Sequence, residues 1–297
     1  MSAGAMHDGV NVIRSGYLLV AGPVNSGKSA LLNALVGVNI SPSHRYPGVT
    51  MTTIAGILDE GDVQICVVDT PPLENGISWM DKWKPDAYCL TLNSRKLSEQ
   101  MSSLCVSRFM NEAGAAPVIV VPTFVDHFPA SLHGALVNQV FTGMNCSGIV
   151  PVCPLSNQGI DKLKNVIAGS LEARSGPIFP RKCLSPHSER FLVSERIRYG
   201  LFRVLPEEIA ATTAVQVEEF SIRDGKRYVR ANLYVSRHSN KGVVIGKKGS
   251  MLQQISEIAT KSASSLMERP LYLDLWVKVR ESWPDRPTDL AEFGYIS

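Results

Sequence analysis

The chain has 297 residues, enough for roughly two domains that each bury a core, and 44% of the residues are hydrophobic. No apolar run is long enough to cross a bilayer, which excludes a membrane span, and six scattered cysteines without a C-x-x-C pair predict reduced core thiols and no zinc site. The formal charge of +3 divides into −2 for residues 1–180 and +5 for residues 181–297, so the second half is the better candidate for nucleic-acid binding.

A nucleotide phosphate loop is predicted near the start of the chain. Residues 22–29 read GPVNSGKS and match G-x-x-x-x-G-K-[ST] at every fixed position. A buried strand is expected over residues 16–21, and a helix from residue 29 to residue 35 would direct its N-terminus at an anion. A chance glycine turn between strand and helix is the alternative. The predicted nucleotide-binding residues of this loop are Asn25, Ser26, Gly27, Lys28, Ser29 and Ala30.

The loop residues have distinct expected roles. The glycines allow backbone N–H groups to turn toward phosphates, and Lys28 would reach the β- and γ-phosphates. The Ser29 hydroxyl would be a Mg²⁺ ligand.

The remainder of the first half alternates between strand and helix patterns. Buried runs cover residues 63–68, 117–121 and 148–152, with helical stretches between them. This pattern predicts an α/β fold with a mostly parallel, doubly wound sheet whose ligand lies at the carboxyl ends of the strands. The expected domains are an extension over residues 1–15, a nucleotide-binding domain over 16–172, a linker rich in Pro, Ser and basic residues over 173–187, and a second domain over 188–297.

The second domain has a different order of elements. An amphipathic helix is expected first, then two strands joined through Asp224-Gly225, a short helix, a longer helix and a final strand. The expected α-β-β-α-α-β elements cover residues 188–205, 213–222, 228–237, a short helix before 246, a helix to about 267, and 271–279.

The loop Gly246-Lys247-Lys248-Gly249 lies between the last two of those helices. G-x-x-G is the backbone clamp of KH-type RNA-binding domains: its glycines let the backbone approach nucleotide phosphates, and the two lysines add charge. The preceding Val243, Val244 and Ile245 are equally compatible with the floor of an apolar groove and with the core. The predicted RNA-binding residues are Ile245, Gly246, Lys247, Lys248 and Gly249.

At these residues the chain resembles the Era-type GTPases, in which a P-loop G domain precedes a type II KH domain. The resemblance is carried by VVIGKKGSMLQQI at residues 243–255, by LYLDLWVKV at 271–279, by the helix that starts at 188, and by the tail from Ser282-Trp283 to Gly294-Tyr295. It implies binding of GTP or GDP with Mg²⁺ and of the 3′ region of small-subunit rRNA, in support of small ribosomal subunit maturation. The implied partners include small ribosomal subunit proteins and other assembly factors.

One departure from the family lies in the motif that contacts the γ-phosphate. The family's D-T-P-G is Asp69-Thr70-Pro71-Pro72 here, and proline has no N–H with which to contact that phosphate. GTP hydrolysis is therefore expected to be weak or lost, and no catalytic residue is assigned. Asp69 would order a Mg²⁺-bound water, with a strand-end cap as the alternative. The predicted metal residues are Ser29, Thr50 and Asp69, and Thr52 and Thr53 compete with Thr50.

A second departure falls on the guanine-reading motif. The family's N-K-x-D is Thr123-Phe124-Val125-Asp126. Asp126 can still accept hydrogen bonds from the guanine edge and Phe124 could stack on the base, whereas Thr123 lacks the tethering amide of asparagine. The S-A element of the family matches poorly, with Leu155-Ser156 at the place where it belongs. A degenerate loop without base contact is the alternative, so guanine preference is expected to be weakened.

Three functions remain open at this point. They are an RNA-binding assembly factor that holds nucleotide mainly as structure, an active GTPase that cycles on the small subunit, and a small-molecule phosphotransferase. Pro72 favours the first, and no substrate-domain motif supports the third. Residues 1–15 carry no evident secretory signal. Erosion of the G motifs suits a eukaryotic organelle, so the mitochondrial matrix is expected, with the cytoplasm as alternative.

Overall fold

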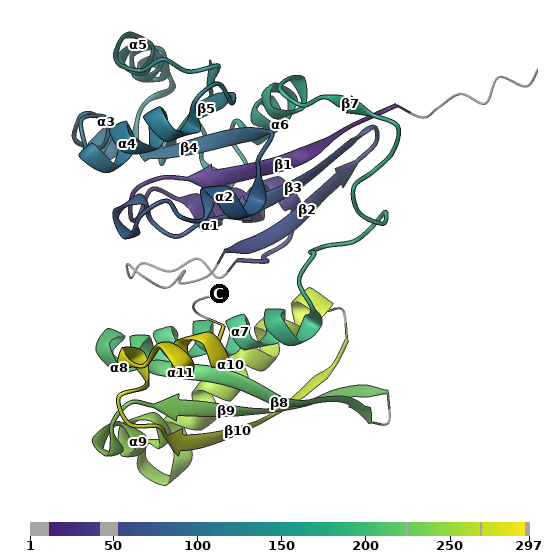
Figure 1. Ribbon diagram of the computed structural model, residues 1–297, viewed down its shortest axis with the longest axis vertical. Coiled ribbons are helices and arrows are strands. Elements are labelled where there is room, and N and C mark those ends of the chain that lie inside the picture. The colour runs from purple at the N-terminus through teal and green to yellow at the C-terminus, as the bar shows by residue number, and fades with distance from the viewer. Residues whose placement is uncertain (1–11, 42–52, 224, 268, 295–297) are drawn as a thin grey trace, which may run out of the picture. The chain divides into compact units, whose positions relative to one another are not determined.

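The computed structural model of the chain describes residues 12–41, 53–223, 225–267 and 269–294 (Figure 1). These residues form two compact units. The first comprises the described parts of Met1–Gly37, Ala55–Val68 and Ile77–Pro186, and the second comprises those of Val38–Ile54, Asp69–Gly76 and His187–Ser297.

A seven-stranded, mostly parallel sheet organises the nucleotide-binding half. Its strand order is β2-β3-β1-β4-β5-β6, and β7 pairs antiparallel with β1. β4 is parallel to both β1 and β5, so these strands end at the same edge. The strands are β1 Ile13–Ala21, β2 Ile54–Glu60, β3 Val63–Asp69, β4 Ala87–Asn93, β5 Val118–Thr123, β6 Gly148–Ile149 and β7 Ala173–Arg174.

Helices connect these strands, as the alternating sequence pattern predicts. They are α1 Lys28–Val36, α2 Met80–Trp83, α3 Leu97–Met101, α4 Leu104–Ala113, α5 His133–Gly143 and α6 Ile160–Gly169. Short 3₁₀ turns are η1 Leu73–Asn75, η2 Ser94–Lys96, η3 Val125–His127, η4 Ala130–Leu132 and η5 Pro154–Ser156. The central strands are apolar along nearly their whole length because both faces of a parallel sheet are covered.

The strands differ from the sequence-based expectation in four details. β2, β4 and β7 are not among the predicted strands, and β6 is shorter than the predicted 148–152. Pro151 has no N–H to donate. The N–H groups of Val150 and Val152 still bond to β5, at 3.0 Å from Val120 O and 2.8 Å from Pro122 O.

Residues 175–186, which follow β7, form a segment along the outermost strand β2 that we call the strap. The Ile57 N–H donates to Leu184 O at 2.9 Å, and Ser185 Oγ donates to Ala55 O at 2.6 Å. Asp59 accepts the Lys182 N–H at 2.9 Å and pairs with Arg181. Residues 173–186, from the segment expected to be a linker, therefore pack within the first unit.

The C-terminal domain is an α+β unit in which helices lie along one face of a three-stranded sheet (Figure 1). Strand β9 is central, parallel to β10 and antiparallel to β8. The elements are α7 Glu189–Val204, α8 Glu207–Ala211, β8 Thr213–Arg223, β9 Lys226–Val235, α9 His238–Ile245, η6 Lys247–Gly249, α10 Ser250–Met267, β10 Leu271–Val279, η7 Trp283–Asp285 and α11 Pro287–Glu292. The expected order holds, with the short α8 added; Asp224 of the predicted hairpin lies outside the described residues.

Alternation in the strands builds the core of this domain. Inward residues of the sheet pack under α7 and α10, and the two helices approach closely at Gly200, where a Cβ atom would lie 2.9 Å from Ile255 O. The core includes Val193, Ile197, Leu201, Val229, Ala231, Leu233, Val235, Ile255, Ala259, Leu273 and Leu275. The Ser188 hydroxyl caps α7 by accepting the Phe191 N–H at 3.2 Å.

Two features are absent from the described ranges. None of the helices there is both long and apolar enough to cross a bilayer. The same ranges contain no group of three or more His, Cys, Asp or Glu side chains placed to hold a metal ion.

Candidate functional site

The predicted phosphate loop connects the end of β1 to the start of α1. Gly27, with φ 92° and ψ 16°, directly precedes the helix in the left-handed region that favours glycine. A Cβ atom on Gly22 would lie 2.5 Å from both Ser26 Oγ and Thr91 O, which leaves no room for a side chain. Both fixed glycines of the motif are therefore required by the shape of the loop.

Lys28 folds back over this loop. Its ammonium group donates to Gly22 O at 3.0 Å and to Pro23 O at 2.8 Å, and the residue is only 7% exposed. Ser29 and Ala30 follow in the first turn of α1, while Asn25 is exposed at the tip of the loop with φ 55°. A buried ammonium beside a helix N-terminus is an arrangement that favours an anion such as a phosphate group.

Hydroxyl groups join the loop to neighbouring strands. Ser26 Oγ lies 2.7 Å from Thr91 Oγ1 of β4, and Thr91 Oγ1 donates to Ala21 O at 3.1 Å. Thr123 Oγ1, at the end of β5, shares its single proton between two carbonyl oxygens, Ser26 O at 2.8 Å and Leu92 O at 3.1 Å, and the contact to Ser26 O is the shorter. Thr123 lacks the tethering amide of asparagine, as the sequence indicates; its shorter hydroxyl nevertheless reaches the loop backbone.

The other residues that were predicted to contact the guanine base make contacts within their own loops. Asp126 lies in η3 with its side chain 42% exposed, and its Oδ2 is 3.7 Å from His127 Nε2. Phe124, which precedes η3, has φ 58° and is half-buried. Ser156 is exposed in η5, and its Oγ donates to Cys153 O at 3.5 Å. Asp126 is thus an accessible carboxylate acceptor.

Asp69 ends β3 and is fully buried, and its Oδ2 accepts a hydrogen bond from Ser41 Oγ at 2.8 Å. Carboxylate and hydroxyl oxygens are ligands that suit Mg²⁺. Pro72 begins the turn η1, where its carbonyl accepts the Asn75 N–H at 2.9 Å. Thr50 and its alternative Thr52 lie outside the described residues, whereas Thr53 is described.

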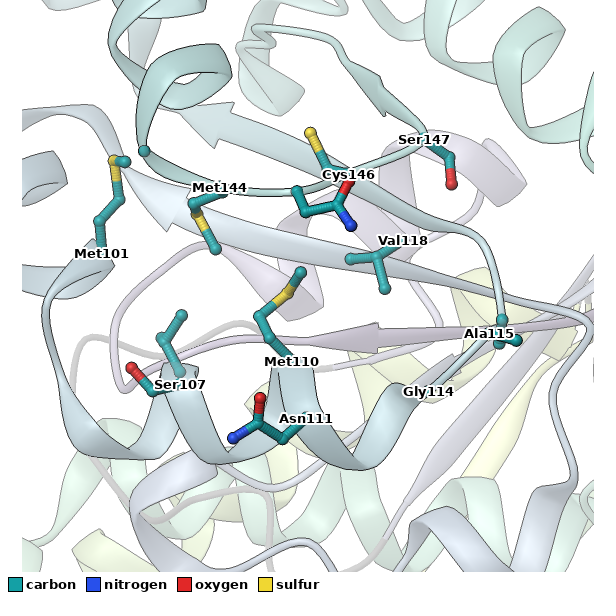
Figure 2. A pocket seen from close by; sticks show the side chains of 14 residues that line it. Met101, Ser107, Met110, Asn111, Gly114, Ala115, Val118, Met144, Cys146 and Ser147 are labelled. Atoms are coloured by element: carbon teal, nitrogen blue, oxygen red, sulfur yellow. The ribbon is translucent and has the colours of Figure 1, made fainter.

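A separate pocket of about 580 Å³ lies beside α4 and the segment that leads into β6. Figure 2 shows Met110 projecting from α4 toward the segment that carries Met144 and Cys146. Every lining residue is uncharged, so the pocket offers no cation for a phosphate group. The loop, with its buried ammonium group, is therefore the better candidate for a nucleotide site than this pocket.

The predicted KH clamp has the backbone that its glycines suggest. Gly246 ends α9 with φ 73° and ψ 175°, and a Cβ atom there would lie 2.6 Å from Met251 Cγ. Gly249 has φ 82° and donates its N–H to Gly246 O at 3.2 Å. Lys247 and Lys248 are exposed between them. The loop therefore presents two cations on a backbone without bulky side chains at its ends.

The three apolar residues before the clamp divide between the two predicted roles. Val244 is fully buried in the core, whereas Val243 is 42% exposed and Ile245 is half-buried. Met251, just after the clamp, is also partly exposed. The apolar surface beside the clamp is thus available from Val243, Ile245 and Met251.

Thr91 is the residue of the nucleotide site that the sequence reasoning missed. The available signal was a single hydroxyl in the apolar run Tyr88-Cys89-Leu90-Thr91-Leu92. It is fully buried and lies beside the phosphate loop, although it is 65 residues away from Ser26 in the chain.

Comparison with known proteins agrees with this geometry. Residues 17–121 match the family described as 50S ribosome-binding GTPase, and residues 196–284 match the family described as KH domain. GTPase Era of Geotalea uraniireducens is 33% identical over 294 residues, covering 95% of this chain and 98% of that protein. The chain belongs to the GTPase Era family. GTPase Era of Trichlorobacter lovleyi is 31% identical over the same shares of both chains.

Solved Era structures have a similar fold to this chain over almost its whole length. A point variant of Era from Aquifex aeolicus, bound to GDP.AlF4-, has a TM-score of 0.85 at 26% identity, covering 96% of this chain and 100% of that one. An Era structure in complex with MgGDPNP and nucleotides 1506–1542 of 16S ribosomal RNA has a TM-score of 0.84 at 26% identity, with the same coverage. The predicted fold class and family are confirmed.

Proposed function

We propose that the chain is an Era-type assembly factor that binds guanine nucleotide with Mg²⁺ and the 3′ region of small-subunit rRNA. The observation that carries this proposal is the presence in one chain of a formed phosphate loop, Gly22–Ser29, and a formed KH clamp, Gly246–Gly249. The Era structure in complex with MgGDPNP and nucleotides 1506–1542 of 16S ribosomal RNA supports the choice of both ligands.

The loop residues fit a nucleoside diphosphate. Gly22 and Gly27 let the loop backbone pack closely against Thr91 and Thr123. In this loop α1 would direct backbone N–H groups toward phosphate oxygens, and Lys28 would move from the loop carbonyls to the phosphates. Bound Mg²⁺ would neutralise phosphate charge, and Ser29 and Asp69 have the oxygen ligands that would hold it directly or through water. Thr50 is proposed as a third ligand from the sequence alone.

Hydrolysis of GTP is proposed to be slow. Pro72 has no N–H to offer a γ-phosphate, and its carbonyl is used to begin the turn η1. The bond made by the family's glycine at this position is therefore missing, and its loss slows hydrolysis because such a bond strengthens as charge develops on the γ-phosphate in the transition state. The nucleotide would then serve mainly to stabilise the G domain.

The proposed biological role is to hold an immature small subunit while its rRNA 3′ end matures. Small ribosomal subunit proteins and other assembly factors are the proposed neighbours. We propose the mitochondrial matrix as the compartment, on the basis of the altered G motifs, and a tagged chain seen only in the cytosol would overturn this assignment.

The deciding experiment is to extract and identify the nucleotide that copurifies with the full-length protein. We expect GTP or GDP near one equivalent per chain, and loss of binding in Lys28→Ala because the buried ammonium is removed. Lys162→Ala, an exposed lysine of α6, is the matched control and should retain nucleotide. Nucleotide-free protein that fails to bind added GDP would refute the proposal.

Hydrolysis is measured separately, with GTP in excess and release of inorganic phosphate followed over many turnovers. We expect a rate far below the common range of enzyme turnover, about 1 to 1,000 s⁻¹. A rate inside that range would show an active GTPase.

A further inference from the structure

The phosphate loop of this chain is fixed at both ends by buried hydroxyl groups. Thr91 Oγ1 donates to Ala21 O, where β1 enters the loop, and Thr123 Oγ1 donates to Ser26 O, just before α1. All three hydroxyl residues, Ser26, Thr91 and Thr123, are fully buried. The loop is therefore tied to two adjacent strands of a rigid sheet.

The direction of these hydrogen bonds follows from the number of protons available. A carbonyl oxygen only accepts, so the single proton of Thr91 is used on Ala21 O. Ser26 must then be the donor in the 2.7 Å contact between the two hydroxyl oxygens. The resulting chain runs from Ser26 through Thr91 to Ala21, and hydrogen bonds in such a series strengthen one another in a buried setting.

Thr123 has the more direct effect on the ligand-binding backbone. A trans peptide is planar, so the Gly27 N–H points opposite to the Ser26 carbonyl. Because Thr123 holds that carbonyl toward β5, the Gly27 N–H is turned away from β5. A Cβ atom on Gly27 would also lie 3.3 Å from Thr123 Cγ2, a tight contact that adds to the φ of 92° in favouring glycine there.

The structure assigns Thr91 and Thr123 as positioning residues that hold the phosphate loop in its anion-binding shape and thereby slow the release of a nucleoside diphosphate. This assignment rests on the proposed nucleotide binding and deepens it. It explains how the loop is held at a chain position where the tethering asparagine is replaced by threonine. The protein would then bind the nucleotide mainly through its phosphates.

The test measures release of a fluorescent GDP analogue from the full-length protein by stopped flow. Thr123→Val and Thr91→Val keep the branched shape and remove the hydroxyl, and each should speed release about fivefold, the effect of one lost hydrogen bond. The double variant should release faster than either single variant, without simple multiplication of the two effects because both hydroxyl groups bond Ser26, and Thr123→Ser should restore the wild-type rate. Ser26→Ala removes only the donor to Thr91 and is the fallback variant if a valine variant does not fold.

The matched control is Ser15→Ala. Ser15 is a fully buried hydroxyl of β1 that donates to Gly176 O at 3.4 Å, which is outside the phosphate loop. Ser15→Ala should change the stability of the protein without changing the rate at which the GDP analogue is released. Release rates that are equal in Thr123→Val and Ser15→Ala, or that stay fast in Thr123→Ser, would overturn the assignment.

A second measurement does not depend on nucleotide. Hydrogen exchange of the peptide that covers residues 21–30 should be faster in nucleotide-free Thr123→Val than in nucleotide-free wild type or Ser15→Ala. Unchanged exchange would overturn the positioning role even if the chain binds GDP. If wild type binds no nucleotide, the proposed function fails, and the exchange result still decides whether the hydroxyl groups fix the loop.

Discussion

The two glycine loops of this chain are both intact, whereas the elements that accompany them have diverged to different degrees. The KH clamp keeps both glycines and two exposed lysines, and the phosphate loop keeps Gly22, Gly27 and Lys28. The elements that accompany the phosphate loop have changed, with Pro72 and Thr123 in place of glycine and asparagine. Holding phosphates and sensing the third phosphate thus depend on separate residues, so one function can decline while the other persists.

Charge reversal at the clamp should have the largest effect. Lys247→Asp with Lys248→Asp should weaken binding of a single-stranded oligonucleotide from the 3′ region of small-subunit rRNA by about 100-fold, because two cations are lost and two anions are added. The dependence of log K on log salt should also fall by about 1.4, the value for two neutralised phosphates. Fluorescence anisotropy at several salt concentrations measures both quantities.

The control for this change is Lys82→Asp with Lys84→Asp. It alters net charge equally at positions of the first unit, and the affinity for RNA should remain near that of wild type. Equal losses in both double variants would mean that the clamp contributes only to overall charge. Crosslinks in cells that map outside small-subunit rRNA would contradict the proposed target.

Cysteine labelling can report on the opening of the first unit independently of the second. All six cysteines lie in residues 1–186, and burial raises the pKa of the Cys66 thiol to about 12 and raises that of Cys89 still further. At pH 8 both thiols are therefore protonated in the folded state and react only after the unit opens, where the pKa returns to about 8.5. Their labelling should quicken as pH rises from about 7 to about 9, because the thiolate fraction of the opened state increases.

Nucleotide should slow this labelling. GDP at about 30 times its Kd should reduce modification of Cys66 and Cys89 about 30-fold, because binding stabilises the folded unit by mass action. An RNA oligonucleotide should leave the rate unchanged. Peptide mass spectrometry after timed alkylation distinguishes these outcomes, and protection by RNA equal to that by GDP would contradict independent ligand sites.

Restoring glycine tests the explanation of slow hydrolysis. Pro72→Gly returns an N–H group at this position, and GTP hydrolysis should rise about tenfold, the value of one hydrogen bond to a charged group. GDP affinity should change little, because the γ-phosphate is absent from GDP. Pro71→Gly is the matched control, and an equal increase there would attribute the gain to backbone freedom instead.

The smallest effect is expected on base recognition. Asp126→Asn should reduce the preference for GDP over ADP about fivefold, because a carboxylate that would accept two hydrogen bonds from guanine becomes an amide with one acceptor. Competition binding with both nucleotides measures the ratio. An unchanged ratio would support the alternative that this loop makes no base contact.

The elements that could be predicted from sequence are those whose determinants are local. The phosphate loop and the clamp were predictable because each needs fixed glycines at fixed spacing between recognisable elements, as Gly27 and Gly246 illustrate. The long strands of the second domain were predictable from their period-two alternation. For Val244 and Ile245, the sequence left core and groove open, and burial assigned Val244 to the core.

Features that depend on distant residues could not be predicted in the same way. The loss of asparagine at Thr123 was visible, but the hydrogen bond from its hydroxyl to Ser26 O spans 97 residues. Thr91 has no motif of its own and acquires its role from strand order, which places β4 beside β1. The strap resembled a linker because proline, serine and basic residues are also typical of loops.

The strap has a consequence for solubility. Strand β2 is last in the order of the sheet, and an outermost strand with unpaired backbone groups is a template on which other chains can aggregate. The strap occupies part of that template, because Ile57 donates its N–H to Leu184 O and Ala55 O accepts Ser185 Oγ. A G-domain fragment that stops at residue 172 would uncover this edge, whereas one that stops at Pro186 would keep it covered, so only the longer fragment should remain monomeric at high concentration.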